Sequence, residues 1–303
     1  MMPNLTTPVL PPRLPFTVDY ASGIVSLGSC FADEIGKRLQ ESDFHIELNP
    51  FGALYNPASI AAALHRLVED RPIERGDLVR HEGLWHSWHH HGSFSHSTPG
   101  ATLTACNSRI HRAHLALKDA NLLMVTFGTA WVFELDCEVS DTYLEGGNST
   151  FRGVVANCHK LPPQLFRRRR MTVEEIIAFW HPLMQELAVC FPHLNVLFSV
   201  SPIRHMADGA HGNQLSKSTL LLAIDQLVAH QMSPRHFYFP AYEIVLDELR
   251  DYRYFDEKMT HPTDLAIEVV WERFKRATMV PAIQQQAQFN IKQHKRERHI
   301  PLH

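Results

Sequence analysis

The stretch Gly23-Ile24-Val25-Ser26-Leu27-Gly28-Ser29-Cys30-Phe31-Ala32 contains a predicted change from strand to helix. Its first half is apolar and β-branched, which is typical of a buried strand. Beyond it, Phe31, Ile35 and Leu39 recur at helical spacing, with charged residues on the opposite face. Gly28-Ser29 therefore forms a turn at the carboxyl end of a strand, the edge where ligands bind in open α/β sheets.

Ser29 has two interpretations at such a turn. Its hydroxyl can be exposed at the sheet edge as a nucleophile, with its own backbone N–H pointing at an anion near the helix N-terminus. Serine is equally a favoured residue for capping the first turn of a helix. The local pattern leaves both interpretations open.

Strand-like and helix-like patterns alternate through the rest of the chain. Further strands are expected at 44–48, 122–127, 195–200 and 236–239. Further helices are expected at 57–69, 102–119, 173–190, 215–232 and 264–280. This alternation predicts an α/β fold, a three-layer sandwich with a mainly parallel central sheet covered on both faces.

The chain is expected to form one main domain over residues 21–283. Residues 1–20 are rich in proline and predict an extended arm on the surface. Residues 284–303 predict a loose polar tail. Within the domain, residues 80–100 show no clear period and predict an irregular loop, while 131–135 and the polar turn 146–150 suggest a small hairpin insertion.

Composition excludes several classes of protein. The 303 residues are 45% hydrophobic and carry a formal net charge of −3, so no nucleic-acid or membrane partner is indicated. No apolar run approaches the length of a membrane span. The five cysteines contain no CxxC pair, and their odd number argues against a closed disulfide framework. We therefore expect a cytoplasmic protein; its oligomeric state is left open.

A histidine near the other end of the chain complements Ser29. His261 follows the polar run that begins at Asp256, and Pro262 and Thr263 are start signals for the helix behind it. A loop histidine before the last long helix can reach a serine at the sheet edge, whatever the separation in sequence. The two residues together predict a Ser–His hydrolase.

Several motifs occur in a fixed order between about Val25 and Phe274. They are Gly28-Ser29-Cys30-Phe31-Ala32, Asn49-Pro50-Phe51-Gly52, Tyr55-Asn56-Pro57, Thr126-Phe127-Gly128-Thr129-Ala130-Trp131, Asn157-Cys158-His159-Lys160, Ser199-Val200-Ser201-Pro202-Ile203-Arg204-His205 and His261-Pro262. In this series the chain resembles the GSCFA family, which is grouped with the SGNH (GDSL-like) hydrolases. The resemblance implies a flavodoxin-like SGNH-hydrolase fold and a serine esterase without cofactor or metal. Its substrate would be a small-molecule or glycan ester, such as an O-acetylated carbohydrate.

The resemblance implies that Ser29 attacks the ester carbonyl and that His261 acts as general base. SGNH enzymes commonly carry an aspartate three residues before the histidine, and here that position is Lys258. Asp256 and Glu257 lie nearby, and Asp256 is our tentative third member. A dyad oriented by a backbone carbonyl is the alternative.

Donors for the oxyanion are expected from the backbone N–H groups of Ser29 and Gly52, although Gly52 also fits an ordinary turn. The third block of an SGNH site supplies an asparagine after a glycine, but here Gly128 is followed by Thr129. Thr129 or Asn157 could take that place.

Two further residues are expected to contact substrate. His159 is expected to line the pocket and to meet a polar or anionic group. Arg204 follows a strand end, where it can bind a carboxylate or phosphate or can fix its loop through a salt bridge. Cys30 is expected to pack inward, because the next helical position points about a hundred degrees away. The run Arg167–Arg170 predicts a solvated charge cluster.

The segment His86-Ser87-Trp88-His89-His90-His91-Gly92 has two interpretations. Trp85 and Trp88 predict an aromatic rim that stacks on a sugar ring. Alternate histidines such as His89 and His91 would share one face of a strand and could bind a transition metal. The first interpretation is preferred here.

Two other function classes use the same residues. An O-acyltransferase would employ Ser29 and His261 with a sugar hydroxyl in place of water. A carbohydrate-binding relative without activity would keep the pocket but lack the acidic member.

Overall fold

The central layer is a parallel sheet. The computed structural model describes residues 7–136, 151–229 and 235–298. Its main sheet contains β1 (Gly23–Gly28), β2 (His45–Leu48), β5 (Leu122–Phe127), β8 (Asn195–Val200) and β9 (His236–Tyr238). The strand order is β2-β1-β5-β8-β9, and every neighbouring pair is parallel. This is the flavodoxin-like order, which changes direction between β1 and β5.

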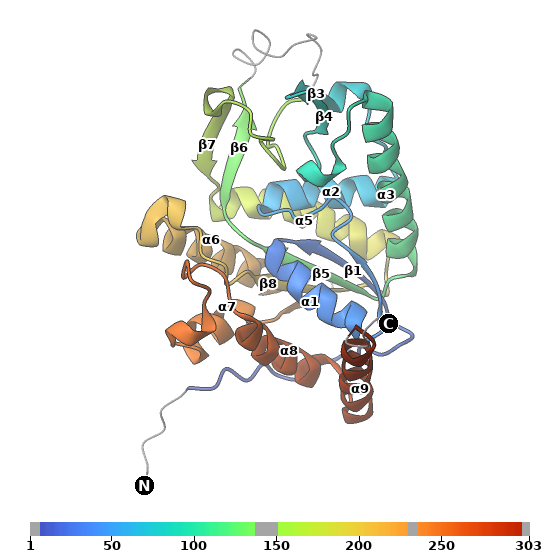
Figure 1. Cartoon of the computed structure of the whole chain (residues 1–303), viewed down its shortest axis with the longest axis vertical. Helices are drawn as coiled ribbons and strands as arrows, with labels where there is room; N and C mark the ends of the chain where they lie inside the picture. The colour runs from blue at the N-terminus through green and yellow to red at the C-terminus, as the bar shows by residue number, and fades with distance from the viewer. Residues whose placement is uncertain (1–6, 137–150, 230–234, 299–303) are drawn as a thin grey trace, which may run out of the picture.

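Helices cover both faces of this sheet (Figure 1). One face carries α2 (Pro57–Glu69), α3 (Pro99–Asp119), α5 (Val173–Cys190) and α6 (Gly209–Ala229). The other carries α1 (Cys30–Glu41), the short α7 (Ala241–Glu243), α8 (Asp264–Thr278) and α9 (Pro281–Arg298). The predicted three-layer α/β sandwich is confirmed.

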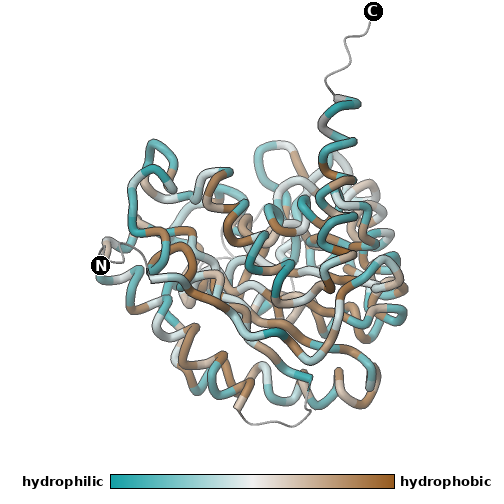
Figure 2. The backbone as a smooth tube through the Cα atoms, turned by 90° about the horizontal axis from the view of Figure 1, so that it is seen from below, coloured by the Kyte–Doolittle hydropathy of each residue, from teal (hydrophilic) through white to brown (hydrophobic). Residues whose placement is uncertain are grey.

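Alternation along the strands divides the core in two. Val25 and Leu27 of β1 pack toward α2 and α3, whereas Ile24 packs toward α1 and α8. The central strands β1, β5 and β8 are buried on both faces because both faces of the sheet are covered, and hydrophobic segments fill the middle of the molecule in Figure 2. Their largely apolar runs made these three strands easy to predict.

Residues 80–100 are more regular than expected. They include most of a hairpin of β3 (Leu78–His81) and β4 (Leu84–Ser87). Its two-residue turn, Glu82-Gly83, has positive φ at both positions (46° and 77°), as a tight hairpin requires. Glu-Gly is a weaker turn signal than Asn-Gly, and histidines hide the alternation, so the expected irregular loop is wrong here.

The arginine run is also part of a strand. β6 (Trp131–Leu135) pairs in antiparallel fashion with β7 (Phe166–Arg170). Arg169 bonds Glu134 and Glu175, and Arg168 lies over the Trp131 ring. Cross-strand partners therefore order what we expected to be a solvated cluster. The predicted turn at 146–150 lies outside the described residues.

The C-terminal segment is helical through Arg298, so the expected loose tail is wrong. Ala287 of α9 is fully buried, and Asn290 Nδ2 donates to Tyr20 Oη and the Ser42 carbonyl. A narrow apolar stripe in a polar sequence holds this helix. The arm at 7–20 has no helix or strand and runs along α8, where Val18 N–H donates to the Thr278 carbonyl. Within the described ranges, no helix combines the length and apolarity of a membrane span.

Candidate functional site

A pocket of about 580 Å³ lies at the carboxyl ends of β1, β5 and β8. Ser29 and His261, which are more than two hundred residues apart in the chain, both line it. Thr129, Asn157 and Arg204 line it as well. The topology therefore brings most of the predicted site residues to one place, at the switch point where the strand order reverses.

Ser29 lies at the start of α1 with a hydroxyl that is unpaired within the described ranges. It occupies the N-cap position of α1, but its hydroxyl makes no capping hydrogen bond. Its Oγ is buried and has no hydrogen-bond partner among the described residues. Buried hydroxyls are normally paired, and this one, at the wall of a pocket, is available to a ligand.

Glycines allow the strand ends to approach Ser29. A Cβ on Gly128 would lie 3.0 Å from the Tyr55 carbonyl oxygen and 3.2 Å from the Ser29 Cβ. A Cβ on Gly28 would lie 2.5 Å from the Thr126 carbonyl oxygen. Both positions need glycine because backbone passes too close for a side chain.

His261 has a carboxylate beside it. The Asp256 Oδ2 lies 3.6 Å from the His261 Nδ1, and the Thr260 hydroxyl lies 3.1 Å from the same nitrogen. The other carboxylate oxygen accepts from the backbone N–H groups of Thr260 and His261. These contacts hold the pKa of Asp256 below its usual range, and the hydrogen bond from the Thr260 N–H contributes most. The carboxylate is therefore ionised at neutral pH.

A tight turn explains how Asp256 reaches His261 from an unusual spacing. Met259 N–H donates to the Asp256 carbonyl, and Asp256 N–H donates to the His261 carbonyl. Met259 has φ 57°, which folds the intervening residues back. Five positions in sequence thus become one contact, although Lys258 occupies the place where an aspartate was expected.

Contrary to the prediction, Gly52 does not line the pocket. Its N–H donates to the Asn49 carbonyl at 2.8 Å, so it closes an ordinary turn. Thr129 does line the pocket, but its N–H donates to the Tyr55 carbonyl and its hydroxyl bonds Ser216 Oγ at 3.0 Å. Asn157 lines the pocket while its Oδ1 accepts from His159 N–H.

His159 is structural rather than a pocket residue. It is buried, stacks on His86 at 4.5 Å, and its Nε2 lies 2.8 Å from the Ser87 carbonyl oxygen. Burial lowers its pKa to about 4, which keeps it neutral. The expected contact between His159 and an anionic substrate group is therefore wrong, because the ring faces the core.

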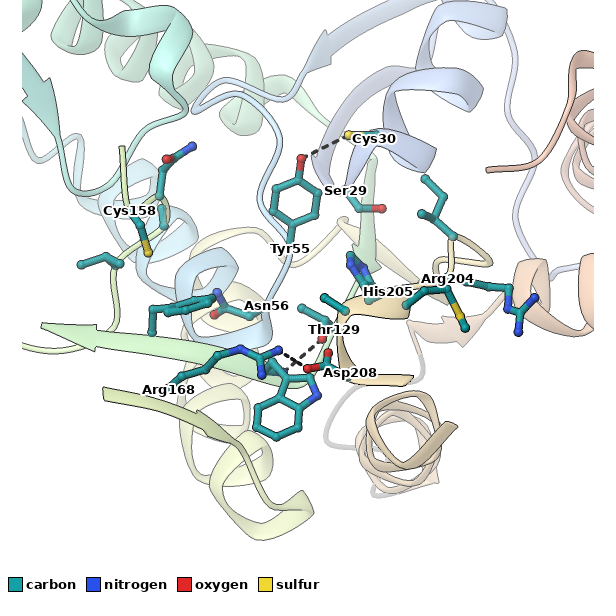
Figure 3. A pocket seen from close by; sticks show the side chains of 18 of the residues that line it. Ser29, Cys30, Tyr55, Asn56, Thr129, Cys158, Arg168, Arg204, His205 and Asp208 are labelled. Atoms are coloured by element: carbon teal, nitrogen blue, oxygen red, sulfur yellow. Dashed lines mark hydrogen bonds and ion pairs between the residues drawn. The ribbon is translucent and has the colours of Figure 1, made fainter. Parts of the chain in front are cut away.

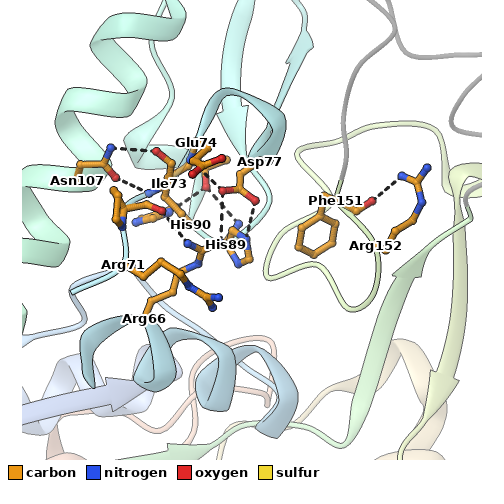
Figure 4. A network of polar contacts seen from close by, with 12 residues as sticks. Arg66, Arg71, Ile73, Glu74, Asp77, His89, His90, Asn107, Phe151 and Arg152 are labelled. Atoms are coloured by element: carbon orange, nitrogen blue, oxygen red, sulfur yellow. Dashed lines mark hydrogen bonds and ion pairs between the residues drawn. The ribbon is translucent and has the colours of Figure 1, made fainter. Parts of the chain in front are cut away.

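Neighbouring side chains of the protein contact the histidine-rich segment 86–92 and fix its position (Figure 4). His89 lies 2.9 Å from Arg66 Nη2 and 3.4 Å from Asp77 Oδ1. Trp88 is fully buried, and Trp85 is stacked under Arg75. The expected aromatic rim is therefore wrong. No three metal-ligating side chains group together in the part of the chain that the structure describes.

Arg204 and Cys30 both border the pocket. The Arg204 N–H donates to the Thr260 carbonyl and so ties its loop to that of His261, and its guanidinium extends away from Ser29 in Figure 3. Contrary to the prediction, Cys30 does not pack fully inward. Its Sγ lies 3.2 Å from Tyr55 Oη, and both side chains line the pocket.

His205 was not predicted as a site residue, although it is the last residue of the motif that begins at Ser199. It lines the pocket, and its ring points toward Ser29 in Figure 3. Its Nε2 is buried and, across the described residues, has no hydrogen-bond partner. Its position just after a strand end, next to Arg204, was the feature that could have identified it.

One face of α6 holds the site loops and was also missed. Asn213 accepts from the His205 N–H, and Ser216 accepts from the Ala130 N–H. Lys217 Nζ donates to the carbonyls of Gly128 (2.5 Å) and Ser201 (2.7 Å). Polar residues at i, i+3 and i+4 on a buried helix face were the feature that could have identified them.

Replacing Lys217 by methionine is expected to change how stability depends on pH. Burial lowers the pKa of Lys217 from 10.5 to about 7. Between these values the unfolded chain binds one proton more than the folded protein, so wild-type stability should rise with pH. Relative to the variant, the expected gain is roughly 1.4 kcal/mol per pH unit above about pH 7, with no change below it.

Urea unfolding of both proteins between about pH 6 and pH 9 measures this difference. Other titrating groups are shared, so they cancel when the curves are subtracted. Parallel curves over the whole range would contradict the expectation and would mean that the folded protein keeps the ammonium.

Comparison with known proteins gives a family and a distant structural likeness. The GSCFA family model matches residues 23–274. No curated protein matches the chain. The crystal structure of a “putative acylhydrolase” from Bacteroides fragilis NCTC 9343 is 8% identical, with a TM-score of 0.40 over 91% of this chain and 92% of that one. The residues matched by the family model include both the turn with Ser29 and the loop with His261.

Proposed function

The chain belongs to the GSCFA family, and from its pocket we propose that it is a serine esterase acting on carboxylic esters. One observation carries the proposal. The unpaired Ser29 hydroxyl lies in the same pocket as His261, which has an ionised carboxylate at its Nδ1. A nucleophile, a base and a group that orients the base are the parts that acyl transfer through serine needs.

The reaction has two steps. Ser29 Oγ attacks the ester carbonyl while His261 takes its proton, and the C–O bond to the alcohol then breaks as His261 protonates the leaving oxygen. Water next attacks the acyl-serine and gives a proton to His261. The bond between the acyl carbon and Ser29 Oγ then breaks as His261 returns the proton to Oγ, and the carboxylic acid leaves. Asp256 stabilises the imidazolium that forms in each step.

The pocket favours an apolar acyl group. Beyond Thr129 it is lined by Trp131 and Phe133 of β6 and by Val155, Ala156 and Cys158. Arg168, ion-paired to Asp208, covers the Trp131 ring with its guanidinium 4.2 Å from the centroid (Figure 3). This arrangement leaves an apolar wall next to a few polar groups, as in most small-molecule sites.

A series of p-nitrophenyl esters from acetate to octanoate tests the proposal. We expect kcat/KM to rise by up to about fourfold per methylene until the pocket is filled, since each buried methylene contributes about 0.8 kcal/mol. Ala156→Trp should lower octanoate turnover more than acetate turnover, because the larger side chain fills the apolar end.

An O-acetylated sugar belongs in the same series, because the resemblance to the family suggested it. Preference for this sugar over every p-nitrophenyl ester would contradict the apolar acyl group but not the esterase. Absence of turnover with all of the esters would contradict the esterase itself.

A further inference from the structure

Three side-chain atoms of residues that line the pocket are buried and have no hydrogen-bond partner within the described residues. They are Ser29 Oγ, His205 Nε2 and Trp131 Nε1, and none has a hydrogen-bond partner within residues 7–136, 151–229 and 235–298. Buried polar groups in proteins are nearly always paired. Unpaired atoms in the wall of a pocket are available to a ligand, and the His205 ring points toward Ser29 (Figure 3).

Two of the expected donors for an oxyanion, Gly52 and Thr129, are already in use. The N–H of Gly52 donates to the Asn49 carbonyl, and the N–H of Thr129 donates to the Tyr55 carbonyl. The Thr129 hydroxyl is shared with Ser216 Oγ. Besides the Ser29 N–H, the donors that remain include the side chains of Asn157, Trp131 and His205, and the His205 ring points toward Ser29 (Figure 3).

The surroundings of His205 oppose its protonation. Burial is the largest cause, followed by Lys217, and the nearby His261 and Arg168 act in the same direction. Only Asp208 opposes them, and the pKa of His205 falls to about 4. The ring is therefore neutral at pH 7, which makes it a poor base but leaves one N–H to donate.

We propose that His205 is a further catalytic residue, a neutral imidazole that donates a hydrogen bond to the oxyanion formed when Ser29 attacks the ester. The inference rests on the proposed function. It assigns proton transfer to His261 and charge stabilisation to His205, so the two histidines of one pocket have different tasks.

The backbone around His205 is fixed from two sides, as a preorganised donor requires. Asn213 Oδ1 of α6 accepts from the His205 N–H at 2.9 Å. The neighbouring Arg204 N–H donates to the Thr260 carbonyl at 3.0 Å. Lys217 joins the Ser201 end of the same loop to Gly128, which lies against Ser29. A donor held before the reaction does not need to reorganise during it.

His205→Ala and His205→Gln test this role. We expect alanine to lower kcat for ester hydrolysis about 10²–10³-fold, with a much smaller change in KM. Glutamine keeps an N–H donor and should recover at least a tenth of the lost rate. Because His205 stays neutral above about pH 5, neither variant should move the acid limb of the kcat profile. His211→Ala, an exposed histidine on α6, is the matched control.

Each outcome decides the proposal. If glutamine is as inactive as alanine and the acid limb disappears, His205 is the base and the inference is wrong. If kcat per folded molecule is unchanged while the melting temperature falls, His205 is only structural. Fluorophosphonate labelling of the wild type separates the two levels: no labelling overturns the esterase and this inference together, whereas equal labelling rates in wild type and His205→Ala overturn the inference alone.

Discussion

Replacing Ser29 by alanine is expected to lower kcat for ester hydrolysis at least about 10⁴-fold, because no acyl-enzyme can form. The same variant should lose labelling by a fluorophosphonate, which reacts covalently with the wild-type hydroxyl. The fold should tolerate the change, since the Ser29 hydroxyl makes no hydrogen bond to the described residues. Circular dichroism and the melting temperature check this point.

Ser108→Ala is a suitable control for the Ser29 experiment. Ser108 is exposed on α3, and its hydroxyl bonds only carbonyls of its own helix. It should keep full activity and labelling. If Ser29→Ala is labelled as fast as the wild type, Ser29 is not the nucleophile and the neighbouring Cys30 becomes the residue to test.

Replacing His261 by alanine is the second large expected effect, a loss of about 10²–10⁴-fold in kcat. The ring lies in the pocket with Ser29, and its Nδ1 faces the ionised Asp256. Without the base, Ser29 must lose its proton unaided. Steady-state kinetics measure the loss, and a high concentration of added imidazole should restore part of it.

Asp256→Asn should cost less, about 10- to 100-fold, because water shares in stabilising an exposed imidazolium. Glu257→Gln is the matched control, since Glu257 is exposed and only one position away. Equal losses in both variants would show a general charge effect rather than a specific contact. Full activity in Asp256→Asn would favour a Ser–His dyad.

Much of the fold was predictable from local patterns. The strand at 122–127 and the helix at 57–69 have the predicted bounds. The first is a largely apolar run, and the second has apolar residues at helical spacing along its whole length. The prediction failed where the pattern was short or masked. The β3–β4 hairpin depends on one Glu-Gly turn, and α9 is held by a few apolar contacts in a polar sequence.

The candidate site was predictable only in part. Ser29 and His261 stand out because each lies at the start of a helix beside a turn. His159 and Gly52 looked equally suitable, yet the structure turns one into the core and uses the amide of the other within a turn. Spacing along the chain does not say which way a loop residue faces.

By itself, the sequence determined the alternation of strands and helices, and with it a parallel sheet whose carboxyl edge carries Ser29. Tertiary structure alone decided that Asp256 reaches His261, that His205 lies unpaired beside the pocket, and that Lys217 joins the ends of two strands. The physical reason is range. The periodicity of apolar residues reports local structure, over a few positions of the chain. These contacts depend instead on strand order and on turns that bring distant segments together.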